Sequence, residues 1–167
     1  METKTAVLGL ILVAICVIPI YLIVRASRKA ERNLLKAIKK IANQKSCKIN
    51  HYDVCGKVII GFDDIKNSIF FLKNSDENSA GNSSSKVVEL SDYKSCKVVK
   101  SKKGVKSNNG NNSDIDKLEL VFEPVSNNKE AVSLEFYNLN DSHQLTIEPE
   151  IIEKWPKIIN NRLKKKK

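Results

Sequence analysis

The stretch KVIIGFDDIKNSIFFLK, residues 57–73, contains two short apolar runs on either side of a polar segment. The runs, 57–62 and 68–72, are rich in Val, Ile and Phe, which favour strands. The segment between them, 63–67, contains Asp and Asn, which are typical turn residues. This stretch therefore predicts a β-hairpin.

Further strands are predicted downstream of the hairpin, at residues 87–90, 96–99, 115–122, 131–137 and 143–147. In 115–122 and 131–137 apolar and polar residues alternate, as they do in strands with one buried face. Segments 74–85 and 101–113 are rich in Asn, Ser and Gly and are predicted to be polar loops. The chain is thus expected to form about seven short, mostly antiparallel strands.

A C-terminal amphipathic helix is predicted to follow the strands. Pro149 suits its first turn, whereas Pro156 lies inside it and is expected to kink or restart it. We expect Trp155 to pack against the sheet, with ligand stacking as the alternative. The apolar face of the helix consists of Ile151, Ile152, Trp155, Ile158, Ile159 and Leu163.

The order of these elements predicts an α+β domain, and its segments resemble a known fold. The segments are GFDDIKNSIFFLK, VVELSDYKSCKVVK, IDKLELVFE, AVSLEFYN and EIIEKWPKIIN, within residues 50–163. They are similar to uncharacterised bacterial single-pass membrane proteins that carry a pleckstrin-homology-like (PH-like) domain. The resemblance implies a small antiparallel β-barrel or sandwich with a C-terminal capping helix, and no catalytic residues. Pleckstrin-homology domains bind lipid headgroups through a basic first hairpin, but the turn 63–67 here is net negative, so phosphoinositide binding is not implied.

The N-terminal part predicts a membrane anchor. Residues 6–24, AVLGLILVAICVIPIYLIV, contain no charge and are long enough to cross a bilayer as a helix. The competing interpretation, a cleaved signal peptide, would have a shorter apolar region after a basic leader. Here the leader is nearly neutral and the basic residues follow the apolar run, which favours an uncleaved span.

Basic residues dominate the segment that follows the predicted span. Residues 25–48 contain nine Lys or Arg and one Glu, so the positive-inside rule places residues 1–5 outside and residues 25–167 in the cytoplasm. Residues 25–49 form a basic juxtamembrane helix or stalk, 50–163 the domain, and 164–167 a lysine tail. The predicted membrane-surface residues are Arg25, Arg28, Lys29, Arg32, Lys36, Lys39, Lys40, Lys164, Lys165, Lys166 and Lys167.

The juxtamembrane helix has an apolar stripe on its other side. The stripe suits either a helix lying on the membrane or a stalk that packs on the domain or on a second copy. The lysine tail suits a solvated helix end, anionic-lipid contact or, in a eukaryotic host, a dilysine retrieval signal. The stripe consists of Leu34, Leu35, Ile38, Ile41 and Ala42.

The net charge of +10 does not indicate nucleic-acid binding. Residues 49–161 contain 14 Lys and 17 Asp or Glu, so the folded part is slightly acidic. The positive charge is concentrated beside the apolar run and at the C-terminus, and a basic groove on the domain is not predicted.

Candidate chemistry is sparse. Cys47, His51 and Cys55 follow C-x3-H-x3-C spacing, which suits a metal only on a continuous helix, whereas this segment runs into a strand. No CxxC pair is present, and a cytoplasmic location predicts reduced thiols. Neither His143 nor any glycine-rich loop forms a recognisable catalytic motif. We therefore expect no enzymatic activity, cofactor or metal.

The leading hypothesis is a membrane-anchored, non-enzymatic interaction or scaffold module whose domain binds a protein partner in the cytoplasm. An alternative is a module that senses anionic lipid through its basic segments. A third hypothesis, a small-ligand-binding barrel, requires a polar-lined interior cavity.

Overall fold

The computed structural model describes residues 2–74, 83–102, 115–126, 128–139 and 149–165, with backbone only for residues 2–12, 102 and 149. The predicted strand 143–147, with His143, lies outside the described residues, as do most of the two predicted polar loops. The chain divides into two compact units, residues 1–36 and residues 37–167. Helix α1 contributes residues to both units.

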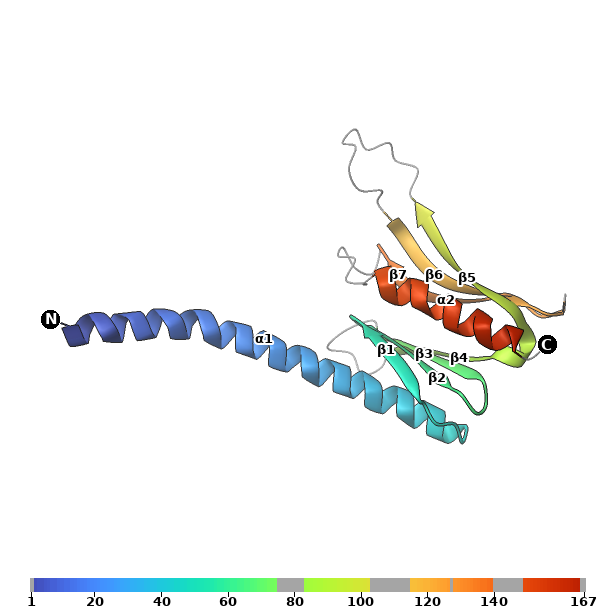
Figure 1. Cartoon of the computed structure of the whole chain (residues 1–167), viewed down its shortest axis with the longest axis horizontal. Helices are drawn as coiled ribbons and strands as arrows, with labels where there is room; N and C mark the ends of the chain where they lie inside the picture. Colours follow the sequence, from blue (N-terminus) through green and yellow to red (C-terminus); the bar gives the residue numbers. More distant parts are fainter. Residues whose placement is uncertain (1, 75–82, 103–114, 127, 140–148, 166–167) are drawn as a thin grey trace. The chain divides into compact units, whose positions relative to one another are not determined.

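One continuous helix, α1 (Glu2–Gln44), replaces the separate span and juxtamembrane helix that the sequence predicts (Figure 1). The helix continues through Pro19, whose missing N–H costs only one backbone hydrogen bond. It ends where Ser46 takes a positive φ of 55°, and the Cys47 N–H donates to the carbonyl of Ala42 at 2.9 Å.

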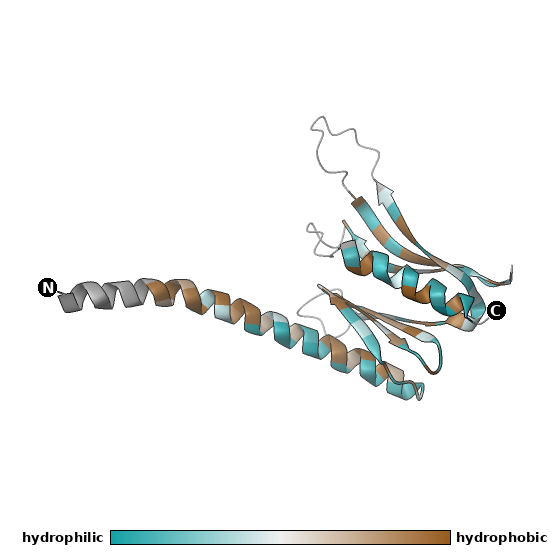
Figure 2. Cartoon of the chain, viewed as in Figure 1, coloured by the Kyte–Doolittle hydropathy of each residue, from teal (hydrophilic) through white to brown (hydrophobic). Residues whose placement is uncertain are grey.

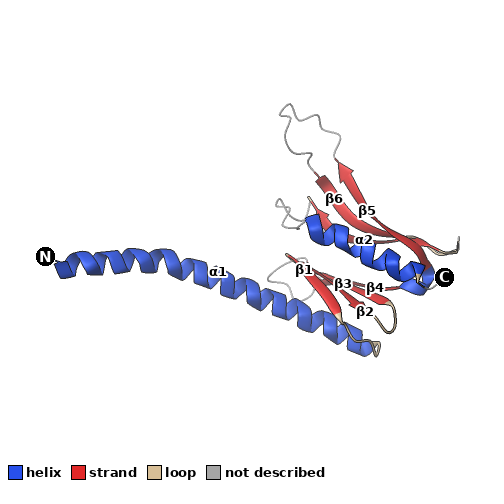
Figure 3. Ribbon diagram, in the orientation of Figure 1, coloured by secondary structure: helices blue, strands red, loops and turns tan. Residues whose placement is uncertain are grey.

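Seven strands form two antiparallel sheets (Figure 3). The first sheet has the order β1 (His51–Cys55), β2 (Val58–Asp63), β3 (Ser68–Asn74), β4 (Ser83–Glu89). A short 3-10 helix, Leu90–Asp92, leads into the second sheet. This sheet has the order β5 (Tyr93–Lys102), β6 (Ile115–Pro124), β7 (Val132–Asn138). No strand pairing joins the two sheets within the described strands, so the expectation of a closed barrel is wrong and the sandwich alternative holds.

The predicted hairpin at 57–73 is confirmed as β2 and β3, with Gly61 opposite Phe70. A preceding strand, β1, was missed, because its sequence HYDVC is short and contains no long apolar run. The turn 63–67 is consequently the second turn of the sheet. The first is Gly56-Lys57, where Gly56 has a φ of 58° that suits glycine.

Strand β2 is buried along its whole length because both of its faces are covered. Val58, Ile60 and Phe62 belong to the core between the sheets. On the opposite face, the side chains of Ile49 and Ile38 cover Gly61, where a Cβ would lie 2.9 Å from Ile49 Cγ2 and 3.5 Å from Ile38 Cδ1. Burial on both sides explains why VIIGF reads as an apolar run instead of an alternating one.

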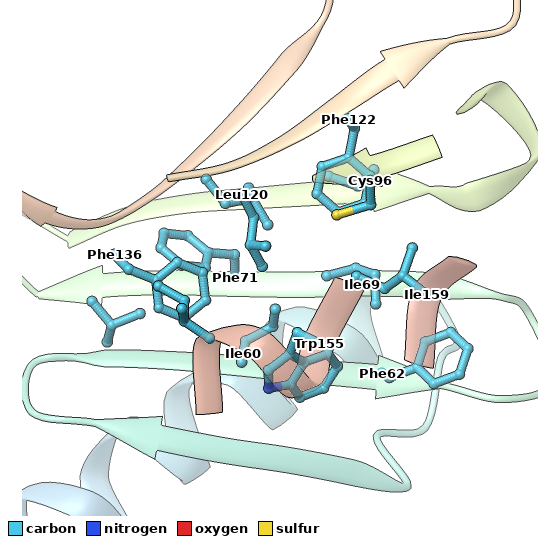
Figure 4. Packing of buried hydrophobic residues seen from close by; sticks show 14 of the residues in the cluster. Ile60, Phe62, Ile69, Phe71, Cys96, Leu120, Phe122, Phe136, Trp155 and Ile159 are labelled. Carbon is cyan, nitrogen blue, oxygen red and sulfur yellow. The ribbon is translucent and has the colours of Figure 1, made fainter. Parts of the chain in front are cut away.

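Helix α2 (Pro149–Lys164) confirms the predicted C-terminal helix and packs across both sheets. Ile152, Trp155 and Ile159 are each at most 1% exposed. Figure 4 shows Trp155 among core residues that include Ile60 and Phe62. The expected restart at Pro156 is wrong, because α2 continues through this residue.

Aromatic side chains contribute to the core between the sheets. The rings of Phe71 and Phe136, one from each sheet, lie 5.2 Å apart (Figure 4). Those of Tyr93 and Phe122 lie 5.6 Å apart in an edge-to-face arrangement. Buried aliphatic and aromatic side chains therefore fill the space in which a small-ligand barrel would hold its ligand.

Candidate membrane-surface site

Helix α1 exposes an apolar surface between residues 13 and 24 (Figure 2). Its large side chains are 43–66% exposed, with Ile23 the most exposed at 66%. Consecutive positions in a helix point in different directions, so this surface surrounds the helix instead of forming one stripe. The exposed residues are Val13, Ile15, Val17, Ile18, Ile20, Tyr21, Leu22, Ile23 and Val24.

Within the part of the chain whose side chains are described, no helix has both the length and the hydropathy of a membrane span. The predicted span, residues 6–24, begins among residues 2–12, whose side chains are not described.

Basic residues follow this apolar surface on one face of α1, which we term the basic face. At about 100° per residue, its members fall within an arc of about 120°. All are exposed, and none forms an ion pair with a described residue. The basic face consists of Arg25, Arg28, Lys29, Arg32, Lys36, Lys39 and Lys40.

The apolar stripe of the juxtamembrane segment has a partner at its C-terminal end. Ile38 and Ala42 are 0% and 1% exposed, and Ile38 lies against the backbone of β2 at Gly61. Of the alternatives for this stripe, packing on the domain is therefore the one observed for these two residues.

The C-terminal lysines lie on a different element from the basic face. Lys164 and Lys165 are exposed at the end of α2, where cations interact favourably with the helix dipole. Lys166 and Lys167 lie outside the described residues.

A polar cluster around Asp64 was missed by the sequence analysis. Its carboxylate accepts hydrogen bonds from Asn50 Nδ2 at 3.3 Å and Arg162 at 2.9 Å, and lies 3.0 Å from His51 Nε2. Arg162 also donates to the Asp64 carbonyl at 3.1 Å and lies 5.7 Å from the centre of the Phe62 ring. A surface concavity of about 400 Å³ adjoins the cluster. No sequence signal predicts this cluster, because its members are separated by up to 112 positions.

A second charged network connects the two sheets. Lys73 of β3 lies 2.6 Å from Glu135 of β7, and Lys117 of β6 lies 3.1 Å from the same carboxylate. Burial alone would raise the pKa of Glu135, but the two ammonium groups hold it below its ordinary value. Lys117 also pairs with Glu119 at 2.9 Å. The charges compensate one another, as expected of a network with a structural role.

The predicted metal-ligand candidates do not form a cluster. His51 is exposed and paired with Asp64, whereas Cys47 and Cys55 are buried. No group of three or more His, Cys, Asp or Glu side chains in the described part of the chain is arranged to hold a metal ion. Burial raises the pKa of Cys96 to about 12, so this thiol is unreactive at neutral pH.

Asp63 has a structural role at the turn between β2 and β3. Its side chain is buried and accepts hydrogen bonds from the backbone N–H groups of Lys48, Ile65 and Lys66, at 2.7, 2.8 and 2.9 Å. Burial alone would raise the pKa of Asp63, but these three donors hold it below its ordinary value. The carboxylate thus joins the end of α1 to the turn.

Comparison with known proteins does not assign the chain to a family or a fold. No family, curated protein or solved structure matches the chain.

Proposed function

We propose that this protein is a membrane-anchored, non-enzymatic interaction module. Helix α1 inserts its apolar part into the cell membrane as a single span, and the domain, residues 50–163, binds a protein partner on the cytoplasmic side. The observation that carries the proposal is the apolar surface of residues 13–24, which is exposed on all sides of α1 and is followed directly by the basic face. An apolar helix surface of this kind is unfavourable in water and is suited to lipid.

The orientation follows from the position of the basic residues. Lys and Arg close to the end of a span remain on the cytoplasmic side. All seven residues of the basic face follow the apolar surface, whereas Lys4 is the one Lys or Arg that precedes it. The N-terminus is therefore outside and the domain inside.

The PH-like resemblance is part of the proposal and has topological support. Four antiparallel strands are followed by three in a second sheet, and one C-terminal helix packs across both. The same arrangement favours an interaction role over an enzymatic one, because buried side chains fill the core. Its charged networks, at Asp64 and at Glu135, are internally paired.

Membrane integration is tested by alkaline carbonate extraction of the full chain from cell membranes. A variant with Val17→Lys and Ile20→Lys places two charges in the apolar surface. The control, Ile65→Lys and Val125→Lys, replaces two apolar residues of the domain that are 79% and 64% exposed. We expect the native chain and the control to stay in the membrane and the first variant to be extracted. Extraction of the native chain would refute the anchor.

The interaction role is tested by crosslinking the full chain in its native membranes and identifying the captured proteins. The control keeps residues 1–49 and lacks the domain. A partner captured by the full chain and not by the control supports the proposal, whereas identical capture by both contradicts it.

A further inference from the structure

The basic face of α1 concentrates like charges at neighbouring positions. Four pairs of its residues are spaced i, i+4 and three are spaced i, i+3, which are the spacings at which helix side chains meet. The one acidic residue of this segment, Glu31, falls outside the arc. Such an arrangement destabilises the helix in isolation and favours an external polyanion that supplies the missing negative charge.

No described carboxylate of the domain forms an ion pair with the basic face. Ile38, which packs against β2 at Gly61, lies outside the arc of the basic face, about 140° around the helix from its centre. Domain carboxylates such as Asp64, Glu119 and Glu135 have partners of their own. Among the described residues, the charges of the basic face are therefore uncompensated.

We propose that the basic face binds the headgroups of anionic phospholipids along its whole length, from Arg25 to Lys40. This inference rests on the proposed membrane anchor. It identifies the residues beside the anchor that contact the membrane surface. The choice of lipid follows from continuity, because the exposed apolar surface ends at Val24 and the basic face begins at the next residue.

The length of the basic face makes the proposal specific. Arg25 and Lys40 are separated by about 22 Å along the helix axis, whereas the headgroup layer of one leaflet is about 5–8 Å thick. On an upright helix, Lys36, Lys39 and Lys40 would lie beyond the headgroups by more than the screening length of about 8 Å. Contact along the whole face therefore requires this segment of α1 to incline toward the membrane. Pro19, inside the apolar surface, provides a position at which a helix bends readily.

The test is lysine acetylation of the full chain in vesicles, with the rate at each lysine measured by mass spectrometry. One set of vesicles contains phosphatidylcholine alone, and the other contains phosphatidylcholine with phosphatidylglycerol. Lys57, Lys94 and Lys157 are exposed on the domain, form no ion pair with a described residue, and serve as internal references. Carbonate extraction of the same vesicles shows separately whether the chain is inserted.

We expect Lys29, Lys36, Lys39 and Lys40 to react at least about threefold more slowly in the anionic vesicles, and the protection to disappear at about 1 M salt. Protection of Lys29 without Lys36, Lys39 and Lys40 would refute the inference and indicate an upright helix. Equal rates in both vesicles would also refute it. A chain that fails to insert would instead contradict the proposed anchor.

Matched variants separate this face from general electrostatics. Lys36→Gln, Lys39→Gln and Lys40→Gln together should abolish the effect of anionic lipid on the labelling of Lys29 or reduce it by half or more. Lys57→Gln, Lys94→Gln and Lys157→Gln remove the same charge from the domain and should leave that effect unchanged. If both triple variants reduce it equally, net charge and not the basic face is responsible.

Discussion

The side-chain amide of Asn160 forms two hydrogen bonds with the backbone of Cys96. Asn160 Nδ2 donates to the Cys96 carbonyl at 2.8 Å, and the Cys96 N–H donates to Asn160 Oδ1 at 2.9 Å. Strand β5 is an edge strand of its sheet, and this amide takes the place of a neighbouring strand at one position. The contact fixes α2 to the second sheet and occupies part of an edge that would otherwise be open to pairing.

Asn160→Ala should lower the free energy of unfolding by about 1–3 kcal/mol, because it leaves the buried N–H and C=O groups of Cys96 without partners. Asn161→Ala is the matched control, since this neighbour is exposed and Ala improves helix propensity equally at both positions. Urea denaturation followed by circular dichroism measures the difference. Equal stability of the two variants would show that the amide contributes nothing.

Gly61→Ala should destabilise the domain by about 1–3 kcal/mol through overpacking. The added Cβ would lie 2.9 Å from Ile49 Cγ2 and 3.1 Å from Ile49 Cδ1, closer than side chains tolerate. Ile49→Ala removes both methyl groups, so the double variant should be more stable than the sum of the single effects predicts. A strictly additive double-mutant cycle, measured by urea denaturation, would show that Ile49 does not cause the clash.

The stability of the domain should fall in acid partly through Asp63. Because its pKa is lowered in the folded state, its contribution is fully present above the unfolded value of about 3.9 and is lost as the pH falls through the folded value. Asp63→Asn should lower the free energy of unfolding at neutral pH. It replaces one carboxylate oxygen by an NH₂ group, which cannot accept a hydrogen bond from the Lys48 N–H or from the N–H groups of Ile65 and Lys66.

The same variant should show a smaller further loss between pH 5 and pH 3 than the native chain, measured as the change in Tm. Asp116→Asn is the control, because its carboxylate forms no ion pair with a described residue. A native-like acid response in Asp63→Asn would assign the acid sensitivity to other carboxylates, of which Glu119 and Glu135 have lowered pKa values as well.

The sequence predicted the elements whose periodicity is strong. The hairpin of β2 and β3, the alternating strands β6 and β7, and the apolar face of α2 with Trp155 were all recognisable. Strand β1 was not, because it is only five residues long and contains no long apolar run. Helix α1 runs without a break through Pro19 and through the change from apolar to basic residues, a continuity that the separate predictions for residues 6–24 and 25–49 do not state.

The sequence predicted which residue types form the candidate membrane-surface site but did not predict how they are arranged in space. The basic residues of 25–40 were identified from charge alone, whereas their restriction to one face matters only once Ile38, outside that face, is known to pack on β2. The cluster of Asn50, His51, Asp64 and Arg162 depends on tertiary contact between α2 and the first sheet. A single sequence contains no local pattern that predicts such contacts.

Labelling of introduced thiols in intact cells with a membrane-impermeant maleimide distinguishes a single span with the domain in the cytoplasm from every other topology. Thr3→Cys precedes the apolar run and Ser27→Cys follows it, each in a Cys16→Ser background. The remaining native thiols are buried, which limits their labelling. We expect Thr3→Cys to react in intact cells and Ser27→Cys to react only after the membrane is permeabilised. Labelling of Ser27→Cys in intact cells, or protection of Thr3→Cys in them, would contradict this topology.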